Sequence, residues 1–421
     1  KDEPQGAAAI FIGSKLQTDQ LSDCSYHNII NCTFEGNSAQ TDSHAIHFQG
    51  KCPGFISLCK FNDNSKANAG AQISTNAGGE LEITDCEIER DLDSTRCRAI
   101  HLLSGKLNLH DCKFKNLAMI QGGSAILIDS SESPAQGINI FIHDNTFTNC
   151  GTQGYVVKCK GPSLSFDNNT IIFDNISESC GCLDIASGNI QAIHEVTNNH
   201  FHHMTTLAGG GVFHYDNGGA SNSRILVDNN TFEFLEGDTQ VCFYIETNSR
   251  NFGFSNNVIQ NNHLQNANSY VCAFNFKGTN GLAVNLENNS FINNSCYSDY
   301  GGGSGIWFQN KENRDADDSV IFTLTFKNCT FDSNYAHYRA GGDIKSGYNG
   351  KGGAFQLGWT ETTSQTELNF EDCRFLNNRS DRQGGALSIS VIQPVTITRC
   401  YFYHNEAGGP NWIEQNKAGA I

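Results

Sequence analysis

The strongest constraint on the fold is a short phrase of residues that recurs along the whole chain. In one copy, Leu324–Phe331, an alternating apolar segment is followed by a polar corner and a second short apolar segment. The last apolar residue of the phrase, its anchor, aligns thirteen copies with spacings of 24 to 44 residues. A self-similar period in this range predicts a solenoid of stacked coils. The anchors are Phe34, Phe61, Ile88, Phe114, Phe147, Ile171, Phe201, Phe232, Ile259, Phe291, Phe331, Phe375 and Phe402.

Positions before the anchor keep their chemistry from copy to copy. The fifth residue before the anchor is apolar in all thirteen copies, from Ile29 to Ile397. The second residue before it is Cys in the first four and last three copies and Asn in the six between. Because side chains alternate along a strand, this column faces inward with the anchor. We therefore expect a ladder of buried Asn amides that bond to one another, since a buried amide needs partners.

A second element accompanies many copies and reads Gly-Gly-Ala followed by an apolar residue, as at Gly352–Phe355 and Gly384–Leu387. Paired glycines permit a sharp corner, and the Ala begins the next strand. Three short strands per turn predict an all-β, parallel β-helix of about 13 coils. It should be right-handed, as crossovers between parallel strands nearly always are. Residues 1–421 then form one domain, with the longest loop insertions at 296–319 and 335–351.

These two motifs together carry a family resemblance. Gly-Gly-Ala-[Ile/Leu/Val] paired with Phe-x-x-Asn resembles the repeat of the polymorphic membrane proteins, β-helical surface adhesins of chlamydiae, and of related protist surface families. The resemblance covers most of the chain, but Cys150, Met204 and Leu235 replace the Asn in central copies. It implies a β-helical surface protein. The Phe-x-x-Asn half occurs at Phe34/Asn37, Phe61/Asn64, Phe291/Asn294, Phe331/Asn334, Phe375/Asn378 and Phe402/Asn405.

The net charge and the lengths of the apolar runs argue against some classes of partner. The net charge of −17 argues against nucleic acid and anionic membrane surfaces. No apolar run reaches the roughly 18 residues of a membrane span, so we expect no direct membrane insertion. The chain starts at Lys1 without Met or a secretory signal and ends in what resembles the opening of another coil. We therefore expect a fragment of a longer chain.

The number and spacing of the cysteines allow both disulfides and free thiols. Seventeen is an odd number, so at least one thiol is unpaired or pairs with another chain, and the absence of Cys-x-x-Cys removes the usual zinc and redox signatures. Cys242 and Cys272 lie about one coil apart, as do Cys150 and Cys180, which is within disulfide reach. For the ladder Cys32–Cys112 we favour reduced, buried thiols.

Polysaccharide lyases and hydrolases also use β-helices, so acid–base residues must be weighed. Such enzymes gather acids with an Arg or Lys on one outward face, and the motifs Asn-Thr-Asp, Gly-His-Gly and Arg-Ile-Lys are missing here. One constellation remains, because the fourth residue before the anchor is His110, His143 and Asp167 in successive copies, flanked by Asp111 and Asp144. Side chains about 5 Å apart suit an acid–base pair or a transition metal. The alternative, which we favour, is a solvated polar corner.

Two further groups are candidates for binding. Asp315, Asp317 and Asp318 faintly resemble a calcium loop but lack its Gly and distant Glu, so we expect a flexible acidic loop and no metal or cofactor. Aromatic residues in and near the longest insertions are candidates for contacting a sugar ring or a partner protein. They are Tyr297, Tyr300, Tyr335, Tyr338, Tyr348 and Trp359.

Together these features predict a non-enzymatic extracellular or cell-surface protein that acts as an adhesin, a stalk or a unit of a surface fibre. The alternatives are a carbohydrate-active enzyme on the same fold and an intracellular structural rod. The expected partners are a protein or glycan at a cell surface, with end-to-end self-association through open strand edges. Five Asn-x-Ser/Thr sites fall third before the anchor, at an outward corner, and are the expected glycosylation sites: Asn31, Asn168, Asn229, Asn288 and Asn328. Asn378, in a similar site, is expected to lie in a ladder instead.

Overall fold

The structure is a computed structural model. It describes residues 9–13, 25–37, 43–49, 53–64, 71–75, 79–90, 98–117, 124–129, 139–150, 154–173, 181–186, 192–203, 205–206, 211–216, 223–237, 243–247, 251–264, 272–277, 283–297, 306–311, 322–337, 350–357, 366–389 and 394–408. Within these residues, no helix has the length and apolar character needed to cross a membrane.

The chain divides into two compact units, Lys1–His200 and Phe201–Ile421. Each unit is a parallel β-solenoid in which a strand pairs with the equivalent strand of the next coil. The strand β21 (His200–His202) contains the last residue of the first unit and the first residues of the second. The sequence-based prediction of a single domain stays a prediction.

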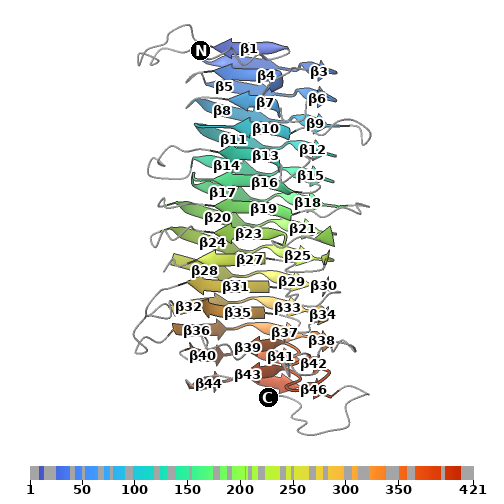
Figure 1. Ribbon diagram of the computed structural model, residues 1–421, viewed down its shortest axis with the longest axis vertical. Coiled ribbons are helices and arrows are strands. Elements are labelled where there is room, and N and C mark those ends of the chain that lie inside the picture. The colour runs from blue at the N-terminus through green and yellow to red at the C-terminus, as the bar shows by residue number, and fades with distance from the viewer. Residues whose placement is uncertain are drawn as a thin grey trace. The chain divides into compact units, whose positions relative to one another are not determined.

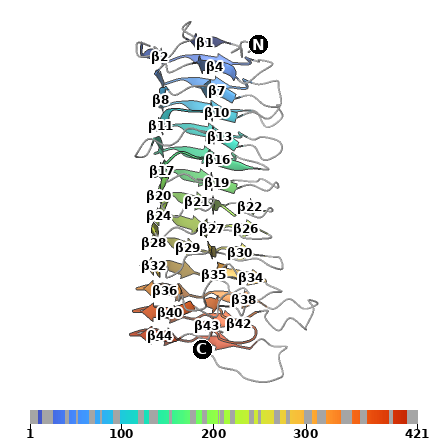
Figure 2. The same cartoon turned by 60° about the vertical axis from the view of Figure 1, so that its left-hand side comes forward.

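The described residues of the first unit form three sheets, whose strands follow one another as rungs in Figures 1 and 2. Sheet A has β1 (Ile10–Gly13), β4 (Ser43–Gln49), β7 (Ala71–Thr75), β10 (Arg98–Leu102), β13 (Ser124–Asp129), β16 (Tyr155–Lys160) and β19 (Gly181–Ala186). Sheet B has β2 (His27–Ile30), β5 (Gly54–Ser57), β8 (Glu80–Thr84), β11 (Lys106–His110), β14 (Ile140–His143), β17 (Leu164–Asp167) and β20 (Ile193–Thr197). Sheet C has β3 (Thr33–Glu35), β6 (Lys60–Asn62), β9 (Glu87–Glu89), β12 (Lys113–Lys115), β15 (Thr146–Thr148) and β18 (Thr170–Ile172).

The second unit repeats this arrangement. Its sheet A strands are β23 (Phe213–Asp216), β27 (Phe243–Thr247), β31 (Cys272–Lys277), β35 (Ile306–Lys311), β39 (Phe355–Leu357) and β43 (Leu387–Ile389). Its sheet B strands are β24 (Arg224–Asp228), β28 (Asn251–Ser255), β32 (Ala283–Glu287), β36 (Phe322–Lys327), β40 (Thr366–Glu371) and β44 (Val395–Thr398). Its sheet C strands are β25 (Thr231–Glu233), β29 (Val258–Gln260), β33 (Ser290–Ile292), β37 (Thr330–Asp332), β41 (Arg374–Leu376) and β45 (Tyr401–Tyr403).

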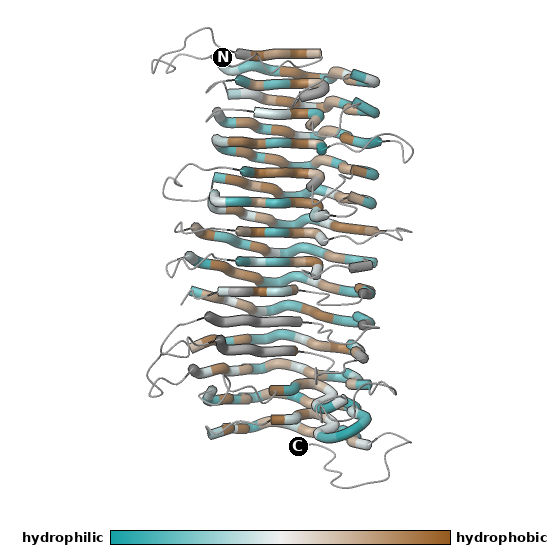
Figure 3. Tube along the Cα trace, in the orientation of Figure 1, coloured by the Kyte–Doolittle hydropathy of each residue, from teal (hydrophilic) through white to brown (hydrophobic). Residues whose placement is uncertain are grey.

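The repeat found in the sequence is the coil of the structure. All thirteen anchors lie in three-residue strands, and all but Phe402 are buried. Anchor rings stack from coil to coil, with centroids 4.7 Å apart for Phe114 and Phe147 and 4.9 Å apart for Phe331 and Phe375. Apolar and polar residues alternate along the strands, as the brown and teal segments of Figure 3 show. The prediction of an all-β parallel solenoid is confirmed.

The second residue before the anchor forms the expected ladder. The Asn169 Oδ1 accepts hydrogen bonds from the backbone N–H and the Nδ2 of Asn145, both at 3.1 Å. The Asn169 Nδ2 donates to the Ile142 carbonyl at 2.8 Å. Asn257 makes the same three bonds in the second unit. Each amide therefore joins two coils and gives corner backbone groups partners in the core.

Cys replaces Asn in this ladder at the start of the chain. The Cys59 Sγ lies 3.4 Å from the Cys32 backbone N and 3.2 Å from the Ser57 carbonyl, so the thiol bonds to backbone groups as an amide would. The thiols of the ladder Cys32–Cys112 are free. Hydrogen bonding to Cys112 raises the pKa of Cys86 to about 12, which keeps this thiol protonated at neutral pH.

The two disulfide pairs considered from the sequence cannot be placed in the same way. Cys180 and Cys242 lie outside the residues that the structure describes, and one of them belongs to each pair. Most of the insertions 296–319 and 335–351 also lie outside those residues.

The residue before the ladder position turns the corner in a left-handed conformation. Its φ lies between 50° and 59° in all thirteen copies. Among residues with a side chain, Asn and Asp adopt this region most readily. This explains why every copy has Asn or Asp there except Leu58 and Arg399.

The two glycines of the Gly-Gly-Ala motif are needed for different reasons: the first for its backbone conformation and the second for lack of room for a side chain. Gly352 and Gly384 each have a φ of +63°, which favours Gly. A Cβ on Gly353 would lie 2.1 Å from the Gly385 carbonyl oxygen, so the second Gly is needed because successive corners stack closely. The strands β39 and β43 begin directly after the Ala of each motif.

The prediction of three strands per coil is incomplete for the second unit. A fourth sheet contains β22 (Thr205–Thr206), β26 (Glu236–Gly237), β30 (His263–Leu264), β34 (Ser295–Tyr297), β38 (Tyr335–His337), β42 (Arg379–Ser380) and β46 (Glu406–Ala407). The Asn three residues after the anchor lies just before the last five of these strands, β30 to β46, and forms a second amide ladder with Nδ2–Oδ1 distances of 2.9 to 3.0 Å. This ladder contains Asn262, Asn294, Asn334, Asn378 and Asn405, and it keeps the chain in register beyond the corner.

The ladder predicts an order of stability among substitutions at Asn169. Asn169→Ala removes the acceptor of the Asn145 backbone N–H and a donor to the Ile142 carbonyl in the core, so we expect the unfolding free energy to fall by about 3 kcal/mol. Asn169→Cys should cost less, because a thiol fills the same position in other coils. Urea unfolding followed by circular dichroism compares the two, with the solvent-facing Thr170→Ala as control. Equal losses for Ala and Cys would contradict the ladder's role.

The corner geometry predicts which Asn residues can carry a glycan. The five corner Asn residues are exposed, whereas Asn378 is buried and bonded to Asn334 and Asn405. After expression through a eukaryotic secretory pathway, glycopeptide mass spectrometry should find glycans at corner sites such as Asn168 and none at Asn378. Glycosylated Asn378 with the corner sites bare would mean that the inward and outward faces are reversed.

Candidate functional site

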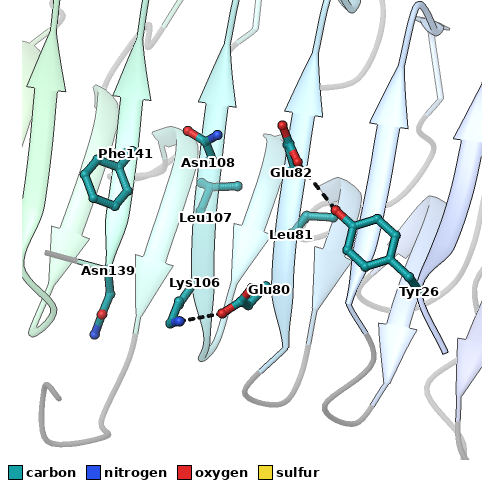
Figure 4. A pocket seen from close by; sticks show the side chains of 9 residues that line it. All are labelled: Tyr26, Glu80, Leu81, Glu82, Lys106, Leu107, Asn108, Asn139 and Phe141. Carbon is teal, nitrogen blue, oxygen red and sulfur yellow. Dashed lines mark hydrogen bonds and ion pairs between the residues drawn. The ribbon is translucent and has the colours of Figure 1, made fainter. Parts of the chain in front are cut away.

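The outer face of sheet B in the first unit carries a groove. In β8, Leu81 and Ile83 point into the core, so Glu80 and Glu82 point outward. The groove has a volume of about 480 Å³ and is shown in Figure 4. We call it the sheet B groove, and its lining residues are Tyr26, Glu80, Leu81, Glu82, Lys106, Leu107, Asn108, Asn139 and Phe141.

Two aromatic side chains lie at opposite ends of the sheet B groove. Tyr26, just before β2, lies at one end and Phe141 of β14 at the other, as Figure 4 shows. Their exposed fractions, 51% and 41%, place them among the most exposed large hydrophobic side chains of the described residues. The groove therefore has a solvent-exposed aromatic ring at each end.

Polar side chains lie between the two rings and are bonded to one another. The Tyr26 hydroxyl donates to the Glu82 Oε2 at 3.4 Å, and the Lys106 Nζ forms an ion pair with the Glu80 Oε1. Burial, and then the nearby Glu82 carboxylate, raise the pKa of Tyr26. The phenol therefore stays protonated at neutral pH and acts as a hydrogen-bond donor.

The two histidines singled out from the sequence border the groove. The rings of His110 and His143 stack with centroids 5.0 Å apart and planes 4° apart, which confirms the expected spacing. The His110 Nε2 lies 3.6 Å from the Glu82 Oε1, and the His143 Nε2 lies 3.2 Å from the Asn108 Oδ1. Each ring thus directs one nitrogen at a residue that lines the groove.

A carboxylate from the adjoining corner holds each ring from its other side. The His110 Nδ1 lies 2.8 Å from the Asp111 Oδ2, and the His143 Nδ1 lies 2.7 Å from the Asp144 Oδ2. Hydrogen bonding from His143, followed by that from Asn168, lowers the pKa of Asp144. The corner carboxylates therefore fix the orientation of both imidazoles.

Asp167 does not join this pair. It lies opposite His143 in register, but its Oδ1 accepts hydrogen bonds from the Thr197 hydroxyl at 2.5 Å and from the Asn198 Nδ2 at 2.6 Å. The carboxylate is thereby directed at the next coil. The histidine nitrogens bond to separate partners rather than to a common point, so this column is arranged for hydrogen bonding rather than for holding a metal ion.

Of the aromatic candidates, the structure describes only the side chain of Tyr335. Its hydroxyl donates to the Asp381 Oδ1 at 2.6 Å, and the Arg379 Cζ lies 5.0 Å from its ring centroid. Tyr335 is thus held by a neighbouring strand of the fourth sheet. The other candidates lie outside the described side chains, namely Tyr297, Tyr300, Tyr338, Tyr348, Trp359, Asp315, Asp317 and Asp318.

Sequence reasoning missed the groove itself, although a signal was present. Glu82, Asn108 and Phe141 are each the sixth residue before an anchor, and Glu80 and Lys106 are each the eighth. Alternation from the inward fifth position places both columns outward. The signal that could have identified the site was Phe141 following the polar residues Glu82 and Asn108 at the same outward position of successive copies.

One comparison with known proteins supports the fold. Residues 20–194 match the model of a family described as right handed beta helix region, which supports the predicted handedness and the β-helical part of the resemblance. Nothing in that match is specific to the polymorphic membrane proteins. The sequence matches no curated protein.

Two solved structures are similar at low identity. One is a mannuronic acid specific polysaccharide family 6 lyase from human gut microbiota, with 9% identity, a TM-score of 0.36, and coverage of 82% of this chain and 81% of that one. The other is the alginate lyase AlyF-OU02 in complex with G6, with 10% identity, a TM-score of 0.30, and coverage of 94% and 88%. Likeness at this level carries no conclusion about this chain.

Proposed function

We propose that the chain is a non-enzymatic extracellular β-helix protein that binds carbohydrate in the sheet B groove. The observation that carries the proposal is the composition of the groove. Tyr26 and Phe141 present exposed rings at its ends, and carboxylate, amide and ammonium groups lie between them. A cavity of about 480 Å³ is of the size that ligand sites in proteins have.

The chemistry of a sugar ring matches this composition. A pyranose ring has C–H groups on its faces and hydroxyl groups around its edge. Aromatic side chains contact the faces, and carboxylate and amide oxygens accept hydrogen bonds from the hydroxyls. Glu82 and Asn108 lie side by side on β8 and β11 in register, where they face the same stretch of a bound chain.

The ion pair of the groove's ammonium group is consistent with binding without cleavage. The Lys106 ammonium, the one cationic group among the lining residues, is paired with Glu80. A surface adhesin or stalk needs recognition alone, and a rigid solenoid presents such a site on a fixed surface. The end-to-end association expected from the sequence remains a prediction that the described residues do not address.

A second candidate function rests on one observation. His143 is held by Asp144 through Nδ1 while its Nε2 faces Asn108 of the groove. A carboxylate-oriented imidazole is a common general base or acid, so this geometry favours a carbohydrate-active enzyme as the alternative.

Carbohydrate binding in the groove predicts the effect of removing one ring. Phe141→Ala should weaken the binding of oligosaccharides that the wild type retains by about tenfold, because one aromatic contact is lost. Isothermal titration calorimetry measures the change. Phe234→Ala is the matched control, since Phe234 is 42% exposed but belongs to the second unit. Equal losses in the two variants would contradict a site in the groove.

Cleavage assays separate the two candidate functions. We expect no new reducing ends and no unsaturated products when the protein is incubated with pectic, alginate and chondroitin-type polymers. Turnover by the wild type that His143→Ala abolishes and Asp167→Ala leaves unchanged would establish the enzyme instead. The two variants are informative together because, of His143 and Asp167, only His143 contacts a residue of the groove.

A further inference from the structure

We infer that the ligand of the sheet B groove is a neutral, extended glycan that crosses the strands, rather than a uronate or sulfated chain. This inference rests on the proposed carbohydrate binding and names the class of sugar. Two features of the groove carry it, namely the balance of its charges and the separation of its two rings.

The charges that line the groove disfavour an anionic sugar. The lining residues include two carboxylates, Glu80 and Glu82, and one ammonium, Lys106. That ammonium already forms an ion pair with Glu80, so the lining offers no uncommitted cation to a uronate. A sugar carboxylate near Glu82 would meet a like charge at short range, where repulsion is strongest.

The imidazoles next to the groove do not reverse this balance. His110 and His143 each have a corner carboxylate within hydrogen-bond distance of Nδ1, Asp111 and Asp144 respectively. Any positive charge on either ring is therefore matched by a carboxylate that faces it. The whole chain carries a net charge of −17, which adds to the repulsion of polyanions.

The separation of the rings sets the direction and length of the ligand. The strands β2, β5, β8, β11 and β14 pair in this order, and Tyr26 directly precedes β2, so the backbones of Tyr26 and Phe141 are four strand steps apart. At about 4.8 Å per step, this amounts to about 19 Å between the two backbones. The Tyr26 side chain extends toward β8, where its hydroxyl bonds to Glu82, so the two rings are closer together than this. About three pyranose rings of an extended chain would reach from one ring to the other. Figure 4 shows that a line between the two rings crosses the strands and passes Glu82 and Asn108.

A matched pair of sugars tests the inference. The β-1,4-linked tetramers of mannose and of mannuronate have the same linkage and differ only in the hydroxymethyl or carboxylate group at C6. We expect isothermal titration calorimetry to give at least about tenfold tighter binding of the mannose tetramer to the wild-type protein. Its affinity should change little with salt, because a neutral ligand has no charge to screen.

Chain length and a charge variant give independent readouts. Mannose oligomers should gain affinity up to the trimer or tetramer and little beyond. Glu80→Gln removes the partner of Lys106, so it should shift the ratio of mannuronate to mannose affinity toward mannuronate by about tenfold. Glu89→Gln, an exposed carboxylate outside the groove lining, is the control and should leave the ratio unchanged.

The outcomes separate this inference from the proposed function. Tighter binding of mannuronate than of mannose, weakened by Phe141→Ala, would overturn the neutral-glycan inference and leave carbohydrate binding in place. Binding of neither sugar, or binding that Phe141→Ala does not affect, would overturn the groove as a carbohydrate site and the inference with it.

Discussion

The hydrogen bonds between a corner amide and the coil before it are the interaction on which the rest of the structure depends. A chain that turns sharply two or three times per coil takes backbone groups out of its sheets at every corner. In the core such groups need partners, and the Asn169 amide gives them to Asn145 and Ile142 of the preceding coil. Because every amide bonds to the neighbouring coil, each coil is held in the same register as the last. The stacked anchor rings then follow from that register.

Fixed register also organises the outer surface. Once the inward columns repeat from coil to coil, outward residues such as Glu82, Asn108 and Phe141 line up across the strands without any contribution to the core. Coils can therefore differ on the outside while their ladders stay the same. The sheet B groove is such a difference, because outward aromatic and charged residues gather over β8, β11 and β14.

Much of the fold was predictable from the sequence because the columns are explicit. The alternation of apolar residues predicted which faces of the strands point inward. The column of Asn and Cys predicted the first ladder. The Asn or Asp that precedes this column in most copies predicted the exposed corner. The spacing of His110 and His143 also followed from register alone. The fourth sheet did not, because its strands are two or three residues long and carry no alternation that a sequence reveals. Only the second ladder, at Asn262–Asn405, marks where its strands β30 to β46 begin.

The candidate site was less predictable for a different physical reason. Alternation tells which way a side chain leaves a strand, but not which neighbour it reaches. Asp167 was expected beside His143, yet its carboxylate bonds to Thr197 and Asn198. Tyr26 precedes β2 by one residue, yet its hydroxyl reaches Glu82 on β8, a contact between coils that are not adjacent. Such long contacts depend on rotamers and on the space that intervening side chains leave.

Hydroxyl-radical footprinting in the presence of a neutral β-linked mannose oligomer tests the central claim most directly. Radicals oxidise exposed aromatic side chains, and mass spectrometry measures the rate at each one. The account predicts slower oxidation of Tyr26 and Phe141 when the sugar is bound, with Tyr401 and Phe234, similarly exposed in the second unit, unchanged. Unchanged rates at Tyr26 and Phe141, with protection at Tyr401 or Phe234, would contradict it.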